Sequence, residues 1–463
     1  MPIFIYNSLS RKKEQFIPLN HPKVNIYTCG VTVYDDSHIG HARSLYIFDV
    51  IRRYLKYRGF DVTFVRNITD VDDKIINRAN ELKVGWQELV EKYIGRYYED
   101  LDVLGIEKGD FEPRATENIA DMVRYIQTLV DKGYAYAAGG DVYFNVRKFP
   151  SYGKLSGQSI DQMETGVRIG PSELKHDPLD FALWKKSKEN EPSWPSPFGP
   201  GRPGWHIECS VMSQKFLKTE TLDIHAGGRD LIFPHHENEI AQAEASTGKQ
   251  FAKYWIHHGL LTINGQKMSK SLGNFITIKD FIEKYKDTDI LKLFFLSAHY
   301  AHPIDYNDRK IEETRQALDR ISNLIRKARD VAYSKASISN GIEEINGIKN
   351  EFVKAMDDDF NTPQALSCIF NLVNLTYKNM NNAVFVKTAE YAVAELSTIL
   401  GLSLTKLQLP NADYEIESKI LERNEARKEG NFALADKMRK ELEVKGVILE
   451  DTKDGNTFWR KKL

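Results

Sequence analysis

The sequence contains only three cysteines, and no two of them lie near each other in the chain. Cys29, Cys209 and Cys368 are odd in number and widely spaced, which excludes the disulfide framework of a small secreted domain. No apolar run approaches the ~20 residues that a membrane-spanning helix needs, and the first residues lack the apolar core of a signal peptide. We therefore expect a soluble protein of the reducing cytoplasm with no membrane partner.

The chain also has almost no net charge, because 64 Lys and Arg residues nearly balance 65 Asp and Glu residues. Such a balance provides no overall field to attract a polyanion, so any binding of nucleic acid must depend on local patches. The length of 463 residues indicates about three domains of ~150 residues each.

The N-terminal third alternates between segments typical of strands and of helices. Val24 to Thr28 and Asp61 to Asn67 are typical of strands, and the stretch between them, His41 to Arg58, has the period of a helix. Its apolar residues recur at spacings of three and four, so they form one face that packs on a sheet: Leu45, Phe48, Ile51 and Leu55. This order of elements predicts a parallel sheet.

The pattern changes after about residue 110. An amphipathic helix ends at Gly133, and a hairpin with arms Tyr134 to Ala138 and Asp141 to Val146 follows, turning at Gly139-Gly140. We interpret this stretch as an insertion between two halves of one sheet. Five prolines between Glu189 and Trp205 predict a loop.

Alternation then resumes with a strand near 222–225, a helix near 236–245 and a strand over 254–261, and nearly everything from residue 280 is predicted to be helical. A charged helix over 414–429 and a short C-terminal end complete the chain. We expect an α/β fold: a Rossmann-type parallel-sheet domain split by an insertion, then a helical bundle and a small C-terminal α/β module. The predicted parts are 1–110 and 176–275 for the two catalytic halves, 111–175 for the insertion, 276–310 for a stem-contact region, 311–400 for the bundle and 401–463 for the last module.

A short segment with two histidines, Ser37 to His41, lies between the first predicted strand and its helix. Helix N-termini present unpaired N–H groups and a positive dipole end, which suit phosphate. His38 and His41 would add directed donors to ATP phosphate oxygens, and Gly40 would let a flat base approach the backbone. Taken alone, the segment is equally compatible with two solvated histidines at a helix start.

A second segment reads Lys267-Met268-Ser269-Lys270-Ser271 and is flanked by turn-forming residues, which predicts a mobile loop. Lys267 and Lys270 could close over a nucleotide and neutralise charge on the transferring phosphates. A solvated basic loop is the alternative for this segment in isolation.

Both segments match, letter for letter, the two signature motifs of class I aminoacyl-tRNA synthetases, which the chain therefore resembles. The resemblance implies that the two motifs border one ATP-binding cleft. It also implies that His38, His41, Lys267 and Lys270 act with ATP-bound Mg²⁺ in amino-acid activation. Gly228 and Asp230, after a predicted strand, could meet the ATP ribose, although a plain turn is the alternative.

Four further residues are of the types that bind zinc: two cysteines, a histidine and a glutamate, the last two sharing a helix face at i, i+4. They are Cys29, Cys209, His235 and Glu239. Each also has an ordinary explanation, as a small buried hydrophobe or a surface polar residue. His236 has no Glu four residues later, so we favour His235 as the ligand.

The surrounding segments resemble cysteinyl-tRNA synthetases in particular: Thr28 to Asp35, Gly204 to Ser210 and Phe233 to Glu239. This resemblance covers essentially the whole chain and implies one Zn²⁺ per chain, held by those four ligands in the amino-acid pocket. It also implies that the pocket is lined by Thr32, Thr69, Trp205 and His225. Zinc binds a soft thiolate far better than a hydroxyl, so such a site would select cysteine over serine.

Three acidic residues, Asp70, Asp72 and Asp73, imitate a Mg²⁺ site, but we interpret them as carboxylates at a helix N-terminus. For the C-terminal module the resemblance implies anticodon binding. Its candidates are cations, an aromatic stacking surface and acceptors for base amino groups: Arg423, Arg427, Asp436, Asp451 and Trp459.

The function expected from this resemblance is ATP-dependent activation of L-cysteine and its transfer to the terminal adenosine of tRNA(Cys), by a protein that is a monomer as the family implies. Two alternatives remain open. One is a cysteine-activating ligase that passes cysteine to an amino sugar, although a small acceptor would not require the chain beyond residue 400. The other is a non-catalytic tRNA-binding paralogue, although both signature motifs are intact.

Overall fold

The computed structural model divides into two compact units, Met1–Leu402 and Ser403–Leu463. The division falls two residues beyond the start expected for the C-terminal module. The structure describes residues 2–160, 174–269, 272–329, 331, 343–404, 419–420, 423–424, 426–427, 431–444, 447–451 and 457–461. Within these residues no helix is both long and apolar enough to cross a membrane.

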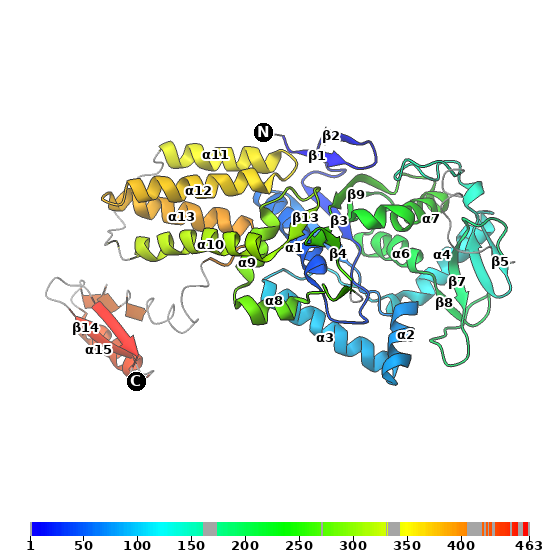
Figure 1. The fold of residues 1–463 in the computed structure, drawn as a ribbon, viewed down its shortest axis with the longest axis horizontal. Coiled ribbons are helices and arrows are strands. Elements are labelled where there is room, and N and C mark those ends of the chain that lie inside the picture. The colour runs from blue at the N-terminus through cyan, green and yellow to red at the C-terminus, as the bar shows by residue number, and fades with distance from the viewer. Residues whose placement is uncertain are drawn as a thin grey trace. The chain divides into compact units, whose positions relative to one another are not determined.

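A four-stranded sheet with the order β10-β9-β3-β4 lies at the centre of the first unit (Figure 1). Its strands are β3 (Lys23–Thr28), β4 (Asp61–Arg66), β9 (Leu222–Gly228) and β10 (Ala252–His258). Every pairing is parallel, which confirms the expected α/β architecture. From the two central strands the chain continues to opposite sides of the sheet, from β3 to β4 and from β9 to β10. In α/β folds a ligand site forms at the carboxyl ends of two such strands.

Helix α1 (Ile39–Tyr57) connects β3 to β4 and begins two residues earlier than the sequence predicted. Leu45, Phe48, Ile51 and Leu55 are all buried, which confirms the predicted apolar face. The helix also has buried positions outside this face because the helices over Thr288–Leu296 and Ala383–Ile399 pack on it as well. Two helices, α2 (Asp73–Leu82) and α3 (Trp86–Leu104), follow β4.

The insertion consists of helix α4 (Ile119–Asp131) and an antiparallel sheet in the order β5-β6-β7-β8. The predicted hairpin is confirmed: β5 (Ala135–Ala138) pairs with β6 (Asp141–Phe144) across two glycines of positive φ. The sheet continues through β7 (Phe181–Lys186) and β8 (Gly201–Pro203), so it crosses the boundary expected at residue 175. The loop expected over 189–205 therefore contains a strand. Proline is tolerated in β8 because this strand is the last one of its sheet.

Helices α6 (Trp205–Leu217) and α7 (Glu237–Thr247) flank the second half of the central sheet, and a turn of π-helix, η4 (Ile232–His236), precedes α7. A further small sheet contains β11 (Leu261–Ile263), β12 (Gln266–Lys267) and β13 (Ile304–Tyr306). Helices α8 (Ile278–Tyr285) and α9 (Thr288–Leu296) lie between β12 and β13 in the chain. The prediction that residues beyond 280 are nearly all helical was thus wrong at β13, whose three residues are too few to show a strand period.

Four helices form the predicted bundle and lie side by side in Figure 1: α10 (Asp308–Arg329), α11 (Glu343–Asp357), α12 (Thr362–Lys378) and α13 (Ala383–Ile399). An N-terminal hairpin, β1 (Phe4–Asn7) with β2 (Lys12–Gln15), completes the first unit. The first unit also contains three short 3-10 helices in its described residues: η1 (Ala115–Asn118), η2 (Val146–Lys148) and η3 (Arg229–Leu231).

The second unit contains helix α15 (Phe432–Val444) and the antiparallel pair β14 (Val447–Asp451) and β15 (Thr457–Lys461). Its core is small and includes Ile420, Leu442, Val447 and Leu449. The helix predicted over 414–429 lies largely outside the described residues.

Candidate functional site

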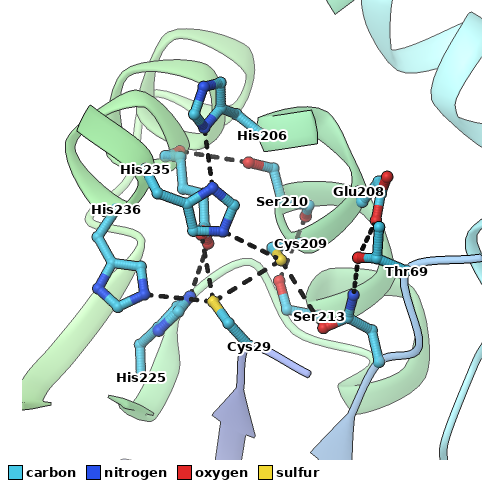
Figure 2. A network of polar contacts seen from close by, with 12 residues as sticks. Cys29, Thr69, His206, Glu208, Cys209, Ser210, Ser213, His225, His235 and His236 are labelled. Carbon is cyan, nitrogen blue, oxygen red and sulfur yellow. Dashed lines mark hydrogen bonds and ion pairs between the residues drawn. The ribbon is translucent and has the colours of Figure 1, made fainter. Parts of the chain in front are cut away.

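The candidate metal ligands meet at the carboxyl ends of β3 and β9. Cys29 follows β3, Cys209 lies on α6 and His235 lies in η4 (Figure 2). Glu239 follows four residues later, in the first turn of α7. One potential ligand atom from each residue lies within 4.8 Å of those of the other three. Cys29 comes from the first half of the sheet domain and the other three residues from the second half, so only folding brings the four together.

The individual distances are those of a compact donor set. Cys29 Sγ lies 3.8 Å from Cys209 Sγ and 3.5 Å from Glu239 Oε1. His235 Nε2 lies 3.6 Å from Cys209 Sγ and 2.9 Å from Glu239 Oε1. Two sulfurs, an imidazole nitrogen and a carboxylate oxygen converging in this way are suited to a tetrahedral cation.

The protein environment favours the charged forms of Glu239 and Cys209, whereas burial raises the pKa of the Cys29 thiol well above its usual range. Burial would raise the pKa of the Glu239 carboxyl, but the charges of His225 and His235 hold that pKa well below its usual range. Burial likewise opposes ionisation of Cys209, yet hydrogen bonding with Cys29 and His235 lowers its pKa to about 6. Metal ligands must be deprotonated to bind, so a carboxylate and a thiolate are prepared for a cation.

A second donor set overlaps the first and contains Cys29, His225, His236 and Glu239. His236 Nε2 lies 3.2 Å from Cys29 Sγ, and His225 Nε2 lies 2.7 Å from Glu239 Oε2. The two sets share Cys29 and Glu239, so the geometry supplies more donor atoms than one tetrahedral cation requires. The other ring nitrogen of His236 is 2.8 Å from His257 Nε2.

Sequence reasoning missed two histidines that support this cluster. His206 Nδ1 lies 2.9 Å from His235 Nδ1, and His257 Nδ1 lies 2.8 Å from the hydroxyl oxygen of Ser8. Hydrogen bonds of this kind fix the orientation of a ligating imidazole. His206 adjoins Trp205 within the segment Gly204 to Ser210, whose family resemblance was the one sign that His206 belongs to the site. Nothing in the sequence connects His257 with Ser8.

The residues expected to line the cysteine pocket surround the same cluster. Trp205 is 37% exposed and stacks on the His235 ring at a centroid distance of 4.0 Å. Thr32 and Thr69 form an isolated bridge between the loops that follow β3 and β4. The Thr69 hydroxyl donates to Glu208 Oε2 at 2.7 Å (Figure 2). Trp205 and His225 therefore contact residues of the donor set directly. Thr69 bonds Glu208, the chain neighbour of Cys209, and Thr32 pairs with Thr69.

The two histidines of the first signature stack at the start of α1, with ring centroids 3.7 Å apart. His38 caps the helix, and its Nδ1 accepts from the backbone N–H of His41, whose own Nδ1 accepts from the N–H of His38. Each Nδ1 is thus an acceptor, which leaves Nε2 as the protonated nitrogen of a neutral ring. Burial, with the charges of His38 and Lys74, lowers the pKa of His41 to about 3.

The space beside Gly40, where a side chain would begin, is occupied by the ring of His38. A side-chain carbon on Gly40 would lie 2.8 Å from Cε1 of His38 and 3.7 Å from the terminal methyl of Met268. The space beside this glycine is therefore filled by the capping ring, so the stacked pair of histidines requires glycine at this position.

The second signature begins at β12, where Lys267 is exposed. Asn274 organises the loop, because its Oδ1 accepts from Ser269 N at 2.8 Å and its Nδ2 donates to Lys267 O at 3.2 Å. Lys270 and Ser271 lie outside the described residues. The loop returns to the first signature through Ile278, whose N–H donates to Ser37 O at 2.9 Å.

The remaining nucleotide candidates end β9. Gly228 is buried at the last position of that strand, and Asp230 is exposed in the turn that follows. Among the acidic residues, Asp72 caps α2 and Asp73 pairs with Lys185 and Arg202. Asp70 instead accepts from Thr116 N at 2.9 Å, so it is not a carboxylate of the helix start.

The C-terminal candidates do not share one exposed face. Arg423 is 3% exposed and donates to Asn424 Oδ1 and Thr457 Oγ1, whereas Arg427 and Asp436 are exposed. The two arginines are four residues apart, a spacing that places residues on one face of a helix, but the contact with Thr457 of β15 helps to bury the first. Asp451 and Trp459 lie in β14 and β15, and their side chains are outside the described residues.

Two regions of the chain match models of known protein families. Residues 15–316 match the model of the tRNA synthetases class I (C) catalytic domain, and residues 351–405 match the DALR domain. In structure, the chain is similar to Mycobacterium tuberculosis methionyl-tRNA synthetase in complex with methionyl-adenylate. The TM-score is 0.63 at 16% identity, covering 85% of this chain and 93% of that one. This likeness supports a class I synthetase fold.

Curated relatives match over nearly their whole length. A cysteine–tRNA ligase of Thermodesulfovibrio yellowstonii is 49% identical over 487 residues, covering 99% of each chain. One from Geobacillus thermodenitrificans is 50% identical over 469 residues, again covering 99% of each. With its parallel-sheet core, its converging sulfur, imidazole and carboxylate donors and these relatives, the chain belongs to the cysteine–tRNA ligase family of class I aminoacyl-tRNA synthetases.

Proposed function

We propose that this protein activates L-cysteine with ATP and transfers it to the 3′-terminal adenosine of tRNA(Cys). The observation that carries the proposal is the donor set of Cys29, Cys209, His235 and Glu239. Cys29 lies on the loop that leads from β3 to the first signature motif. A cavity lined by residues of that signature, including His38 and His41, opens beside the same loop after β3. Amino-acid selection and nucleotide binding would then share one edge of the sheet.

The donor set fits Zn²⁺, one per chain, because two thiolates, an imidazole and a carboxylate are its common ligands. When bound there, zinc would supply a Lewis-acidic position for a soft thiolate that the hydroxyl of serine occupies far less well. His206 and His225 would hold the imidazole and carboxylate ligands in place through the hydrogen bonds to His235 and Glu239. Trp205 would cover the His235 ring.

In the first step an oxygen of the cysteine carboxylate attacks the α-phosphorus of ATP, and the bond to the bridging oxygen breaks to release pyrophosphate. The neutral rings of His38 and His41 direct Nε2–H donors at the phosphate oxygens. Lys267 and Lys270 of the second signature add positive charge as the transition state forms. Mg²⁺ accompanies the ATP and neutralises its phosphates.

In the second step a ribose hydroxyl of the terminal tRNA adenosine attacks the activated carbonyl carbon, and AMP leaves. The helical bundle and the C-terminal unit would hold the tRNA, with Arg427 and Asp436 among the exposed candidates. A variant ending at residue 402 should therefore retain adenylate formation and lose tRNA charging. Retained charging would count against this assignment, whereas transfer of cysteine to an amino sugar would support the small-acceptor alternative.

The direct test is amino-acid-dependent exchange of pyrophosphate into ATP, with cysteine and serine compared before and after removal of bound metal. Exchange with cysteine alone, lost on stripping and restored by zinc, is the expected result. Exchange with serine, or exchange indifferent to metal, would refute selection through the donor set. Absence of exchange with any amino acid would favour a non-catalytic tRNA-binding protein.

A further inference from the structure

Arg43, two residues after the first signature motif, has a fully buried side chain at 0% exposure. Its guanidinium donates to four main-chain carbonyls at distances of 2.6 to 3.2 Å: Gly259 O, Leu260 O, Tyr300 O and His302 O. Each terminal nitrogen carries two hydrogens, so every terminal N–H of the group is used. Burial lowers the pKa of Arg43 to about 10, so the group is charged at neutral pH.

The four carbonyls belong to two segments that are far apart in sequence. Nη1 bonds the Gly259-Leu260 segment that leads from β10 into β11, and Nη2 bonds the Tyr300 to His302 segment that leads into β13. β11 and β13 pair in parallel. β11 also pairs with β12, which ends at Lys267. Arg43 thus joins α1 to the base of the sheet from which the second signature loop emerges.

The other end of that loop is attached to the same helix. Ile39 N donates to Ile276 O at 3.1 Å, and Ile278 N donates to Ser37 O at 2.9 Å. The residues between Lys267 and Ile276 therefore lie between two attachments, both of them on the first turns of α1 or immediately before it. A loop that must reach the phosphates only in the transition state requires ends that do not move.

We infer that Arg43 is a positioning residue that fixes the base of the second signature loop relative to the histidines of the first. This inference rests on the proposed activation of cysteine by ATP. A charge alone would not perform this role, because bridging two backbone segments requires the planar fork of a guanidinium. The ammonium of lysine is a single point that cannot reach all four carbonyls.

Loss of the fork should loosen the two segments without unfolding them. Leu260 O also accepts from Ile304 N at 3.0 Å, and Tyr300 O accepts from Gly259 N at 2.8 Å. The strands therefore retain backbone hydrogen bonds of their own. The effect of a substitution should appear in the chemical step rather than in the global fold.

The test compares Arg43→Lys with a matched control, Arg52→Lys. Arg52 lies on the same helix, is also buried, and bonds Lys108 O and Asp110, far along α1 from the loop. In pyrophosphate exchange we expect kcat of Arg43→Lys to fall by about a hundredfold. Its KM for cysteine should change by less than about threefold, and the control should keep kcat within about twofold. Near-normal kcat in Arg43→Lys would overturn the inference, because charge would then suffice.

A second readout does not depend on activity. Hydrogen exchange of the Gly259 and Ile304 amides should accelerate by about tenfold or more in Arg43→Lys and be unchanged in Arg52→Lys. Unchanged amide protection in Arg43→Lys would refute the attachment, whatever the activity of the wild type. Absence of pyrophosphate exchange in the wild type would instead refute the proposed function. If Arg43→Lys fails to fold, Gly259→Ala tests the same junction, since its added carbon would lie 2.3 Å from the His302 carbonyl. That variant should show the same loss of kcat, and normal kcat would count against the inference.

Discussion

Glu239 Oε1 lies 2.9 Å from His235 Nε2, one helical turn earlier, while its Oε2 lies 2.7 Å from His225 Nε2. One buried carboxylate therefore contacts two imidazoles from different elements, β9 and η4. Glu239 Oε1 also lies 3.5 Å from Cys29 Sγ. Glu239 and Cys29 are the two residues that both overlapping donor sets share.

Replacing Glu239 with Gln should reduce metal affinity by more than about tenfold, because a neutral amide is a poorer ligand and releases both histidines. Metal content after dialysis against a weak chelator measures this. Glu244→Gln is the matched control, since Glu244 lies on the same helix and bonds Lys154 and Phe251 N, away from the sulfurs. Full metal content in Glu239→Gln would exclude the carboxylate as a ligand.

The parallel sheet and the bundle could be predicted because their periodicity extends over many residues, as in the buried face of α1. Two strands could not. β13 has only three residues, and β8 ends in a proline that is acceptable only because the strand lies at a sheet edge. Neither the short strand β13 nor the edge position of β8 can be recognised before the neighbouring strands are known.

For the candidate site, residue types were informative and spatial partners were not. Cys29 and Cys209 are 180 residues apart, so only the family resemblance suggested that they meet. Arg43 carried no signal, because its four acceptors are main-chain carbonyls that have no residue identity. Hydrogen-bond partners of this kind follow from tertiary packing alone.

Glu112 should contribute strongly to stability at the end of β4. Its Oε1 lies 2.6 Å from Arg66 Nη2, and both side chains are buried. Glu112→Gln would leave the guanidinium without its counter-charge, at a cost of about 3 kcal/mol in the free energy of unfolding. Denaturant unfolding measures this cost. Glu81→Gln, which breaks an exposed ion pair with Arg78, should cost less than about 1 kcal/mol; equal effects would mean that burial is irrelevant here.

Asp100 should make stability depend on pH. Burial and the charge of Asp36 raise its pKa to about 7, although a hydrogen bond from Ser37 opposes the shift. The folded protein thus keeps a proton that the unfolded chain releases at about pH 4. The free energy of unfolding should therefore fall as pH rises from about 4 to 7, by on the order of 1 kcal/mol after solvent screening.

Urea unfolding at several pH values, compared between wild type and Asp100→Asn, isolates this contribution. The variant should lose part of the decline, whereas Asp102→Asn, exposed on the same helix, should keep the wild-type slope. Identical slopes in all three proteins would show that Asp100 titrates alike in the folded and unfolded states.

Gly40→Ala should damage activation without a large loss of stability. The added carbon would lie 2.8 Å from the His38 ring, so the ring must move and the stack with His41 must open. Because a displacement of about 1 Å can cost a hundredfold in rate, kcat for pyrophosphate exchange should fall by about that factor. Gly95→Ala is the control: this helical glycine has no neighbour within 4 Å of the added carbon, so alanine should stabilise by about 0.5 kcal/mol and leave kcat unchanged. Normal kcat in Gly40→Ala would mean that the phosphate donors need not be held by the stacked rings.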